Sequence, residues 1–261
     1  MIIDAHAHIY PEKIAAKATG AVGSFYDLPM RHTGSTAELL ASGQKAGVDR
    51  YVVCSVATAP EQVAIIDRFL AAECRQHPEL IGLGSLHPAS PDFAADIALL
   101  KECGFHGAKL HPDFQEFYID DPAVFPLYDL LQSEGIPLLL HTGDPRKAFS
   151  RPERLRTVLA AFPRLCVVAA HFGGWSVWEE AFAALRSARC YVDTCSSLQM
   201  MEPAQALRLI RGYGAERVLF GVDFPMWDHA DELHALERLG LTETELDLLL
   251  HKNAATVFLA G

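Results

Sequence analysis

The sequence predicts an α/β protein, a closed barrel of eight parallel strands and eight helices, on three observations. Short apolar runs rich in β-branched residues recur eight times and alternate with Ala- and Leu-rich stretches of helical period, a pattern typical of parallel βαβ units. The length of 261 residues matches one (β/α)8 barrel. The absence of a Gly-rich phosphate loop after the first strand argues against an open doubly wound sheet. We therefore expect a single domain over residues 1–261.

The expected elements follow one another in a regular order. The strands are expected at residues 2–9, 50–56, 81–87, 106–112, 136–142, 166–172, 189–194 and 217–223. The clearest helices are expected at residues 59–76, 90–104 and 122–135, several of which start at Ser, Asp or Pro and end at Gly. Residues 10–35 form a longer connection, expected as a loop over the mouth of the barrel. Residues 242–261 are expected to form two helical segments that close the fold.

Composition and charge argue against several classes of function. The net charge is −11 and no basic run occurs, which argues against sequence-independent nucleic-acid binding. The six cysteines are scattered without a C-x-x-C pair, which indicates reduced thiols in a cytosol. The chain lacks the pattern of a signal peptide and any apolar run of about 18 residues. We expect a cytoplasmic protein that acts on a small molecule, with no nucleic-acid or membrane partner.

The first strand contains two histidines one residue apart. Because alternate side chains of a strand point to opposite faces, His6 and His8 are expected to share one face, together with Asp4. A lone His-x-His pair is weak evidence for a metal site, since two hydrogen-bonded strand histidines have the same spacing. Asp4 is expected to orient its neighbours rather than to bind a metal. The pair therefore needs support from distant residues.

Polar side chains also stand at the ends of other expected strands. They are Lys109 and His111 after the fourth strand, His141 after the fifth, His171 after the sixth and Asp223 after the eighth. Catalytic side chains of a parallel barrel come from the C-terminal strand ends, so these residues are expected to meet the histidine pair around one cavity. Imidazole nitrogen and carboxylate oxygen suit a divalent metal, with zinc as the default and Mn, Co, Ni or Fe as substitutes. A turn or N-cap role is the alternative for Asp223.

Several stretches, taken together in their order, resemble the amidohydrolase superfamily. They are "DAHAH" at the first strand, "GAKLHP" at the fourth, a histidine closing the fifth, "AHFGGW" at the sixth and "RVLFGVDFPMW" at the eighth. The pattern is most similar to the branch related to aminocarboxymuconate-semialdehyde decarboxylase and runs from residue 2 to about residue 227. The resemblance implies a TIM barrel of the metallo-dependent hydrolase type, and a homodimer is common among such proteins.

The resemblance also implies roles for individual residues. The implied metal ligands are His6, His8, His141 and Asp223, and His171 is implied as a catalytic residue near the metal. One metal ion is expected rather than two, because the "KLHP" form occurs in branches thought mononuclear. Lys109 and His111 are then pocket residues, whereas in the binuclear alternative Lys109 is carboxylated and bridges two ions.

Other residues near the strand ends are candidates for contact with substrate. Arg31, Arg146 and Gln115 lie on expected mouth loops and are candidates for anchoring a substrate, with a solvated surface arginine as the competing interpretation. Trp175 is a candidate wall for a planar substrate, although packing is the usual role of Trp.

Two reactions fit this set of residues. In the leading hypothesis, metal-activated water hydrolyses an amide, ester or lactone bond, Asp223 transfers the proton and His171 stabilises the developing oxyanion. The alternative is nonoxidative decarboxylation of an unsaturated or aromatic carboxylic acid, in which His171 or Asp223 protonates carbon and an arginine holds a carboxylate. A third hypothesis is a barrel that binds a ligand without catalysis, which predicts a missing metal ligand. An arginine in the pocket would favour the decarboxylase.

Overall fold

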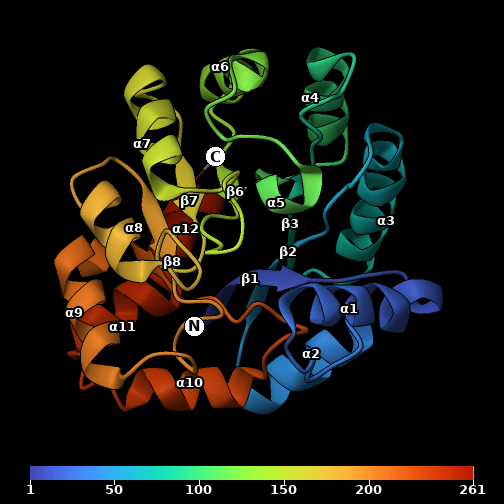
Figure 1. The fold of residues 1–261 in the computed structure, drawn as a ribbon. Helices are drawn as coiled ribbons and strands as arrows, with labels where there is room; N and C mark the ends of the chain where they lie inside the picture. The colour runs from blue at the N-terminus through green and yellow to red at the C-terminus, as the bar shows by residue number, and fades with distance from the viewer. Residues whose placement is uncertain (261) are drawn as a thin grey trace.

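The computed structural model describes residues 1–260, and its strands form a central ring surrounded by helices (Figure 1). All pairings between neighbouring strands are parallel. One sheet contains β1 (Ile3–His8), β2 (Arg50–Cys54) and β3 (Leu80–Gly82) in that order. The other contains β4 (Gly84–Ser85), β5 (Ala108–Leu110), β6 (Leu138–Leu140), β7 (Val167–Ala169), β8 (Tyr191–Asp193) and β9 (Val218–Leu219).

Backbone hydrogen bonds join the two sheets into one closed barrel. The strands β3 and β4 together occupy one strand position of the barrel, and Leu83 is the single residue between them. The N–H of Leu83 donates to the carbonyl oxygen of Val53 in β2 at 2.9 Å. At the other seam the N–H of Ala5 in β1 donates to the carbonyl oxygen of Phe220, just after β9, at 2.9 Å. The predicted (β/α)8 barrel is thereby confirmed. Each observed strand lies within a predicted range, except that β3 begins one residue early.

The helices lie outside the ring, where local sequence signals set several of their ends. They are α1 (Glu12–Tyr26), α2 (Thr36–Ala46), α3 (Val63–Gln76), α4 (Phe93–Glu102), α5 (Pro112–Gln115), α6 (Phe125–Glu134), α7 (Pro152–Ala161), α8 (Trp178–Leu185), α9 (Pro203–Tyr213), α10 (His229–Glu237), α11 (Glu243–Asp247) and α12 (Asn253–Phe258). Ser35 caps α2 and Asp92 caps α4 by accepting a backbone N–H, and Gly135 ends α6 in the left-handed conformation. Within residues 1–260, every helix is too short or too polar to span a membrane.

The connection after β1 differs from the expectation. The sequence predicts a loop over residues 10–35, but α1 occupies most of this range. Its buried positions include Ala15, Thr19, Gly23 and Tyr26, which follow one face of a helix. Gly23 lies on that face because a Cβ there would meet the carbonyl oxygen of Leu28 at 2.9 Å. The glycines of α1 lower the helix propensity of this segment. Packing against the barrel mouth therefore decides that the segment is helical.

Apolar side chains form two layers, one inside the ring of strands and one outside it. The inner layer fills the barrel with Ile3, Ala5, Val52, Cys54, Ile81, Leu83, Leu139, Val168, Ala170, Cys195, Leu219, Ala254, Val257 and Phe258. Its last three members come from α12, and Phe258 lies next to Gly107 at the start of β5. The helix α12 therefore packs against the N-terminal ends of the strands, opposite the mouth. A larger outer layer lies between the strands and the surrounding helices.

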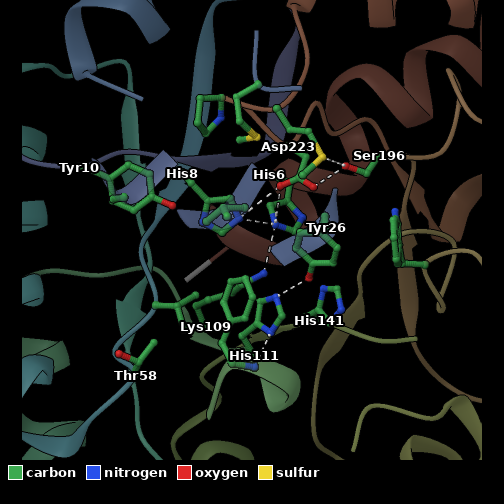
Figure 2. A pocket seen from close by; sticks show the side chains of 18 of the residues that line it. His6, His8, Tyr10, Tyr26, Thr58, Lys109, His111, His141, Ser196 and Asp223 are labelled. Atoms are coloured by element: carbon green, nitrogen blue, oxygen red, sulfur yellow. Dashed lines mark hydrogen bonds and ion pairs between the residues drawn. The ribbon is translucent and has the colours of Figure 1, made fainter. Parts of the chain in front are cut away.

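A β-bulge in β1 decides which of its side chains face inward. The register with β2 shifts between Asp4 and Ala7, so strict alternation is interrupted. The side chain of Asp4 lies outside the barrel, where its Oδ2 is 3.2 Å from Nε2 of His229 in α10. His6 and His8 nevertheless both face the interior (Figure 2). The expectation that Asp4 shares their face is therefore wrong, because the bulge adds one residue between them.

Candidate active site

A pocket of about 490 Å³ opens at the C-terminal ends of the strands. The structure brings eight of the residues predicted from sequence together on its wall: His6, His8, Lys109, His111, His141, His171, Trp175 and Asp223. Much of the remaining wall is apolar and is formed by Ile14, Ala18, Val22, Met30, Val56, Phe114, Pro225 and Met226. The polar groups therefore gather at one part of a largely apolar cavity.

Three strand exits turn sharply where they enter the pocket. His171, Ser196 and Asp223 have φ values of 61°, 48° and 64°, in the left-handed region that non-glycine residues rarely adopt. All three line the cavity. Such strain costs about 1–3 kcal/mol per residue and is typical of functional sites, where it aims side chains that an unstrained backbone would direct elsewhere.

His6, His8 and Asp223 meet at one point. Nε2 of His6 lies 3.2 Å from Nε2 of His8. Oδ1 of Asp223 lies 3.3 Å from Nε2 of His8 and 3.8 Å from Nε2 of His6 (Figure 2). Ligand atoms about 2.1 Å from a tetrahedral zinc ion are separated from each other by roughly 3.4 Å. The three atoms are therefore spaced as the ligands of one small cation would be.

Outer partners determine which ring nitrogens of this pair carry protons. Nδ1 of His6 lies 2.9 Å from Oδ2 of the buried Asp193, which as a carboxylate only accepts hydrogen bonds. Nδ1 of His8 lies 3.5 Å from Sγ of Cys54, whose own thiol donates to a backbone carbonyl. We therefore assign the proton to Nδ1 in both rings. In the neutral form of each ring the inward Nε2 atom is then free of a proton, as metal binding requires.

His141 and His171 have the same arrangement. Nδ1 of His171 lies 3.1 Å from the carbonyl oxygen of Cys195, and Nε2 of His141 lies 3.1 Å from the carbonyl oxygen of Gly143. Because carbonyl oxygens only accept hydrogen bonds, these nitrogens carry the protons. The two remaining nitrogens, Nε2 of His171 and Nδ1 of His141, face each other at 3.0 Å, both without a proton. Only a shared proton or a cation stabilises such a pair.

Burial and neighbouring charges shift the acidities of these groups. Burial, together with the nearby His141, lowers the pKa of His171 to about 3. Burial likewise lowers the pKa of His6. For His8, burial lowers the pKa but Cys54 and Asp223 raise it, to about 9, so that a metal has to displace a proton there. Burial raises the pKa of Asp223, yet the surrounding histidines outweigh it and hold that pKa well below its ordinary value.

Lys109 supplies a cation at the deep end of the pocket. Its side chain is almost fully buried, and Nζ lies 3.1 Å from Nε2 of His6 (Figure 2). A buried ammonium group needs a nearby acceptor or anion. Lys109 is therefore positioned to donate to the unprotonated nitrogen of His6 or to an oxygen of a bound molecule.

Sequence reasoning missed three residues that organise the site. Asp193, at the end of β8, binds His6 as above and also accepts the backbone N–H of His171 at 2.8 Å. Ser196 donates to Oδ2 of Asp223 at 2.5 Å (Figure 2). Tyr26, from α1, brings a hydroxyl group into the pocket. Asp193 was detectable in principle, because it ends its strand as the predicted ligands do, whereas Ser196 and Tyr26 carry no comparable signal.

Three expected substrate contacts lie elsewhere. The Arg31 guanidinium is 2.6 Å from the carboxylate of Asp231, and 57% of its side chain is exposed. Arg146 is held by Asp144 through contacts of 2.8 and 3.0 Å. Gln115 is buried and donates to two backbone carbonyls at 2.7 and 2.8 Å. None of the three lines the pocket, although the Arg146 guanidinium lies 5.5 and 5.6 Å from the ring centroids of Tyr26 and Trp175, which do.

Comparisons with solved structures support the same fold. An uncharacterised TIM-barrel protein from Bordetella bronchiseptica is similar at 20% identity, with 98% of this chain and 97% of that chain covered and a TM-score of 0.79. A dihydroxybenzoic acid decarboxylase from a Polaromonas species, solved with bound manganese, is similar at 18% identity, with coverage of 98% and 96% and a TM-score of 0.77. A protein assigned as a 2-pyrone-4,6-dicarboxylic acid hydrolase from Pseudomonas putida is similar at 19% identity, with coverage of 98% and 97% and a TM-score of 0.69.

The family itself is settled by sequence. Residues 3–259 match the amidohydrolase family, which is nearly the whole chain. This match confirms the resemblance inferred from the strand-end motifs. Members of this superfamily are metal-dependent enzymes, and the histidine and carboxylate groups at the barrel mouth provide candidate ligands for a divalent metal. The chain belongs to the amidohydrolase family and is a metal-dependent enzyme of that superfamily.

Proposed function

We propose that the protein hydrolyses an amide, ester or lactone bond of a small and largely apolar molecule with the help of one divalent metal ion, zinc by default. The observation that carries this proposal is the convergence of imidazole nitrogens and one carboxylate at the polar end of an apolar pocket. The donor set fits the ion, and His6, His8, His141 and Asp223 would hold it. Such an ion, when bound, acts as a Lewis acid and lowers the pKa of a water ligand.

The side chains themselves perform the proton transfers. Asp223 remains a carboxylate because its pKa is well below the ordinary value, and Ser196 occupies its Oδ2, which leaves Oδ1 directed at the histidines. Asp223 accepts a proton from the attacking water and returns it to the leaving group. His171 has its unprotonated Nε2 facing inward, so it can accept a hydrogen bond from the attacking water but cannot donate one to an oxyanion. Lys109 is the N–H donor for the developing negative charge.

The residues that line the pocket favour hydrolysis over decarboxylation. The decarboxylase hypothesis expects an arginine that holds a carboxylate, yet among residues 1–260 no arginine lines the pocket. Arg31 and Arg146 are paired with Asp231 and Asp144 instead. Decarboxylation of an aromatic acid remains the second candidate, because the buried Lys109 is a cation that could hold a carboxylate. A non-catalytic barrel is disfavoured, since every predicted ligand lines the pocket.

The test identifies the products that the metal-loaded protein forms. The metal-loaded protein is incubated with a panel of small esters, lactones, amides and aromatic acids in water enriched in oxygen-18. Hydrolysis predicts one labelled oxygen in the product acid, whereas decarboxylation predicts release of carbon dioxide and an organic product that carries no label. The variants His141→Ala and Asp223→Ala are expected to lose turnover, and His106→Ala, which removes an exposed histidine, is the matched control. Retained turnover in both site variants would refute the assignment.

A further inference from the structure

The hydroxyl group of Tyr26 is held rigidly at the wall of the pocket. Tyr26 is the last residue of α1, lines the cavity and is only 9% exposed. Its ring packs edge-on against Trp175, with the ring centroids 4.9 Å apart, and is tilted against Phe114, with the centroids 5.9 Å apart. Its Oη lies 3.1 Å from Nε2 of His111, and Figure 2 marks this hydrogen bond with a dashed line. Which of these two atoms donates the hydrogen bond decides what Tyr26 can do.

The backbone of α5 determines the tautomer of His111. His111 caps this helix, and its Nδ1 accepts the N–H of Phe114 at 3.3 Å. Its ring is fixed between two parallel rings, with centroids 3.8 Å from Phe114 and 3.9 Å from His141. A neutral imidazole whose Nδ1 accepts a hydrogen bond carries its proton on Nε2.

The proton of Tyr26 is consequently directed into the pocket. If Nε2 of His111 donates to Oη, the phenolic O–H has to donate elsewhere, and among residues 1–260 the structure provides no other hydrogen-bond partner for it. The cavity is the space that Tyr26 faces. We propose that Tyr26 is a catalytic residue whose hydroxyl group donates a hydrogen bond to the reacting oxygen of the substrate. This inference rests on the proposed hydrolysis, in which negative charge develops on that oxygen.

The same arrangement defines the class of molecule that the site accepts. Tyr26 and Lys109 provide donors at the polar end, next to the histidines. The remaining wall is largely apolar and includes the faces of Phe114 and Trp175. The fitting ligand therefore has an apolar or aromatic body and one oxygen-rich head, such as a carbonyl group that becomes tetrahedral. Phenylphosphonate combines a phenyl ring with a tetrahedral oxyanion and serves as a probe of this class.

The first experiment measures the affinity of the metal-loaded protein for phenylphosphonate by calorimetry. Tyr26→Phe retains the ring and is expected to weaken binding by about 10- to 100-fold, the value of one hydrogen bond to a charged acceptor. Tyr118→Phe, which removes the hydroxyl of a 42% exposed tyrosine outside the pocket, is the matched control and is expected to bind as the wild type does. Metal content is expected to be equal in all three proteins, whereas Tyr26→Phe is expected to melt at a lower temperature because the buried Nε2–H of His111 loses its acceptor.

Several outcomes overturn the proposal. A Tyr26→Phe variant that binds phenylphosphonate within twofold of the wild type removes the donor role, and a wild type that does not bind the probe removes the oxyanion site as a whole. Nitrogen-15 NMR of the full chain is expected to find His111 protonated at Nε2, and a proton at Nδ1 contradicts the argument. Binding of phenylphosphonate is measured without turnover. The proposed hydrolysis and the proposed role of Tyr26 are therefore contradicted by different results. If the wild type binds the probe but hydrolyses nothing, the hydrolase proposal fails, whereas the Tyr26 proposal fails through the variant.

Discussion

Asp193→Asn is the sharpest test of the tautomer argument on which the metal site depends. Asp193 is fully buried and accepts hydrogen bonds from Nδ1 of His6 at 2.9 Å, the N–H of His171 at 2.8 Å and Sγ of Cys195 at 2.9 Å. Asparagine has one carbonyl oxygen and one NH₂ group in place of two accepting oxygens. In either amide orientation, the NH₂ group faces a donor, either His6 or the backbone of His171.

The expected loss of metal affinity follows from the change of tautomer that the substitution forces on His6. If the amide donates to Nδ1, the proton of His6 moves to Nε2, which is the atom that faces His8 and Asp223. His6 then no longer offers a lone pair to the metal. Changes of this kind in the partner of a ligand histidine lower metal affinity by about 10- to 100-fold, equivalent to about 1.4–2.8 kcal/mol. The free energy of unfolding is also expected to fall by about 1–3 kcal/mol, because a buried donor loses its partner.

The assay is competition for zinc between the protein and a chromogenic chelator at fixed pH. Asp67→Asn is the matched control, since Asp67 is an equally buried carboxyl group on α3, bonded to the backbone of Ser85 and outside the pocket. The control is expected to bind zinc as the wild type does. If Asp193→Asn also bound zinc within twofold of the wild type, the assignment of the proton on His6 would be wrong, and with it the argument for unprotonated inward nitrogens.

Three further predictions concern the metal, a buried carboxyl group and a loop glycine. Metal analysis of protein purified without chelator is expected to give about one divalent ion per chain, and a chelator is expected to remove the ion and the activity together. Asp67→Asn is expected to gain stability over the wild type as pH rises in denaturant titrations. Burial, with the charge of Asp96, raises the pKa of Asp67 from 3.8 to about 7, so between these values only the folded state retains the proton, and wild-type stability falls by about 4 kcal/mol and is then constant. Gly143→Ala is expected to lower the free energy of unfolding by more than about 2 kcal/mol, because φ is +75° and a Cβ would lie 2.5 Å from the backbone of Gly174.

Each of these three has a result that contradicts it. Two tightly held ions per chain would favour the binuclear arrangement, with Lys109 as a bridging ligand. A stability difference between Asp67→Asn and the wild type that is equal at pH 4 and pH 8 would mean that Asp67 ionises normally in the folded state. A Gly143→Ala variant that unfolds at the wild-type denaturant concentration would mean that the loop after β6 adapts without strain.

The barrel and most of the pocket wall were predictable because both depend on local patterns. A run of four to eight apolar residues predicts a strand, and a polar residue at the C-terminal end of that strand has to lie at the mouth of a parallel barrel. His141 and Asp223 are more than 80 positions apart in the chain, yet each is found by this rule alone. Asp193 satisfies the same rule, but its strand contains no histidine that would mark it as part of the site.

The errors came from features that only the assembled structure determines. The bulge in β1 arises from its pairing with β2 and moves Asp4 to the opposite side of the strand from the one that alternation predicts. The helix α1 has weak intrinsic propensity and forms because the barrel mouth covers one of its faces. Arg31 and Arg146 lie on mouth loops as expected, but Asp231 and Asp144 pair with them. The carboxylate that binds Arg31 is 200 positions away in the sequence, so no local pattern reveals it.

The inner apolar layer has a consequence for how the chain folds. Ile3 and Ala5 from the first strand pack in the same cluster as Ala254, Val257 and Phe258 from α12. The floor of the barrel is therefore complete only when the two ends of the sequence have come together, and contacts this far apart in sequence are slow to form. A folding intermediate in which α12 has not yet packed exposes the apolar side chains at the N-terminal ends of the strands.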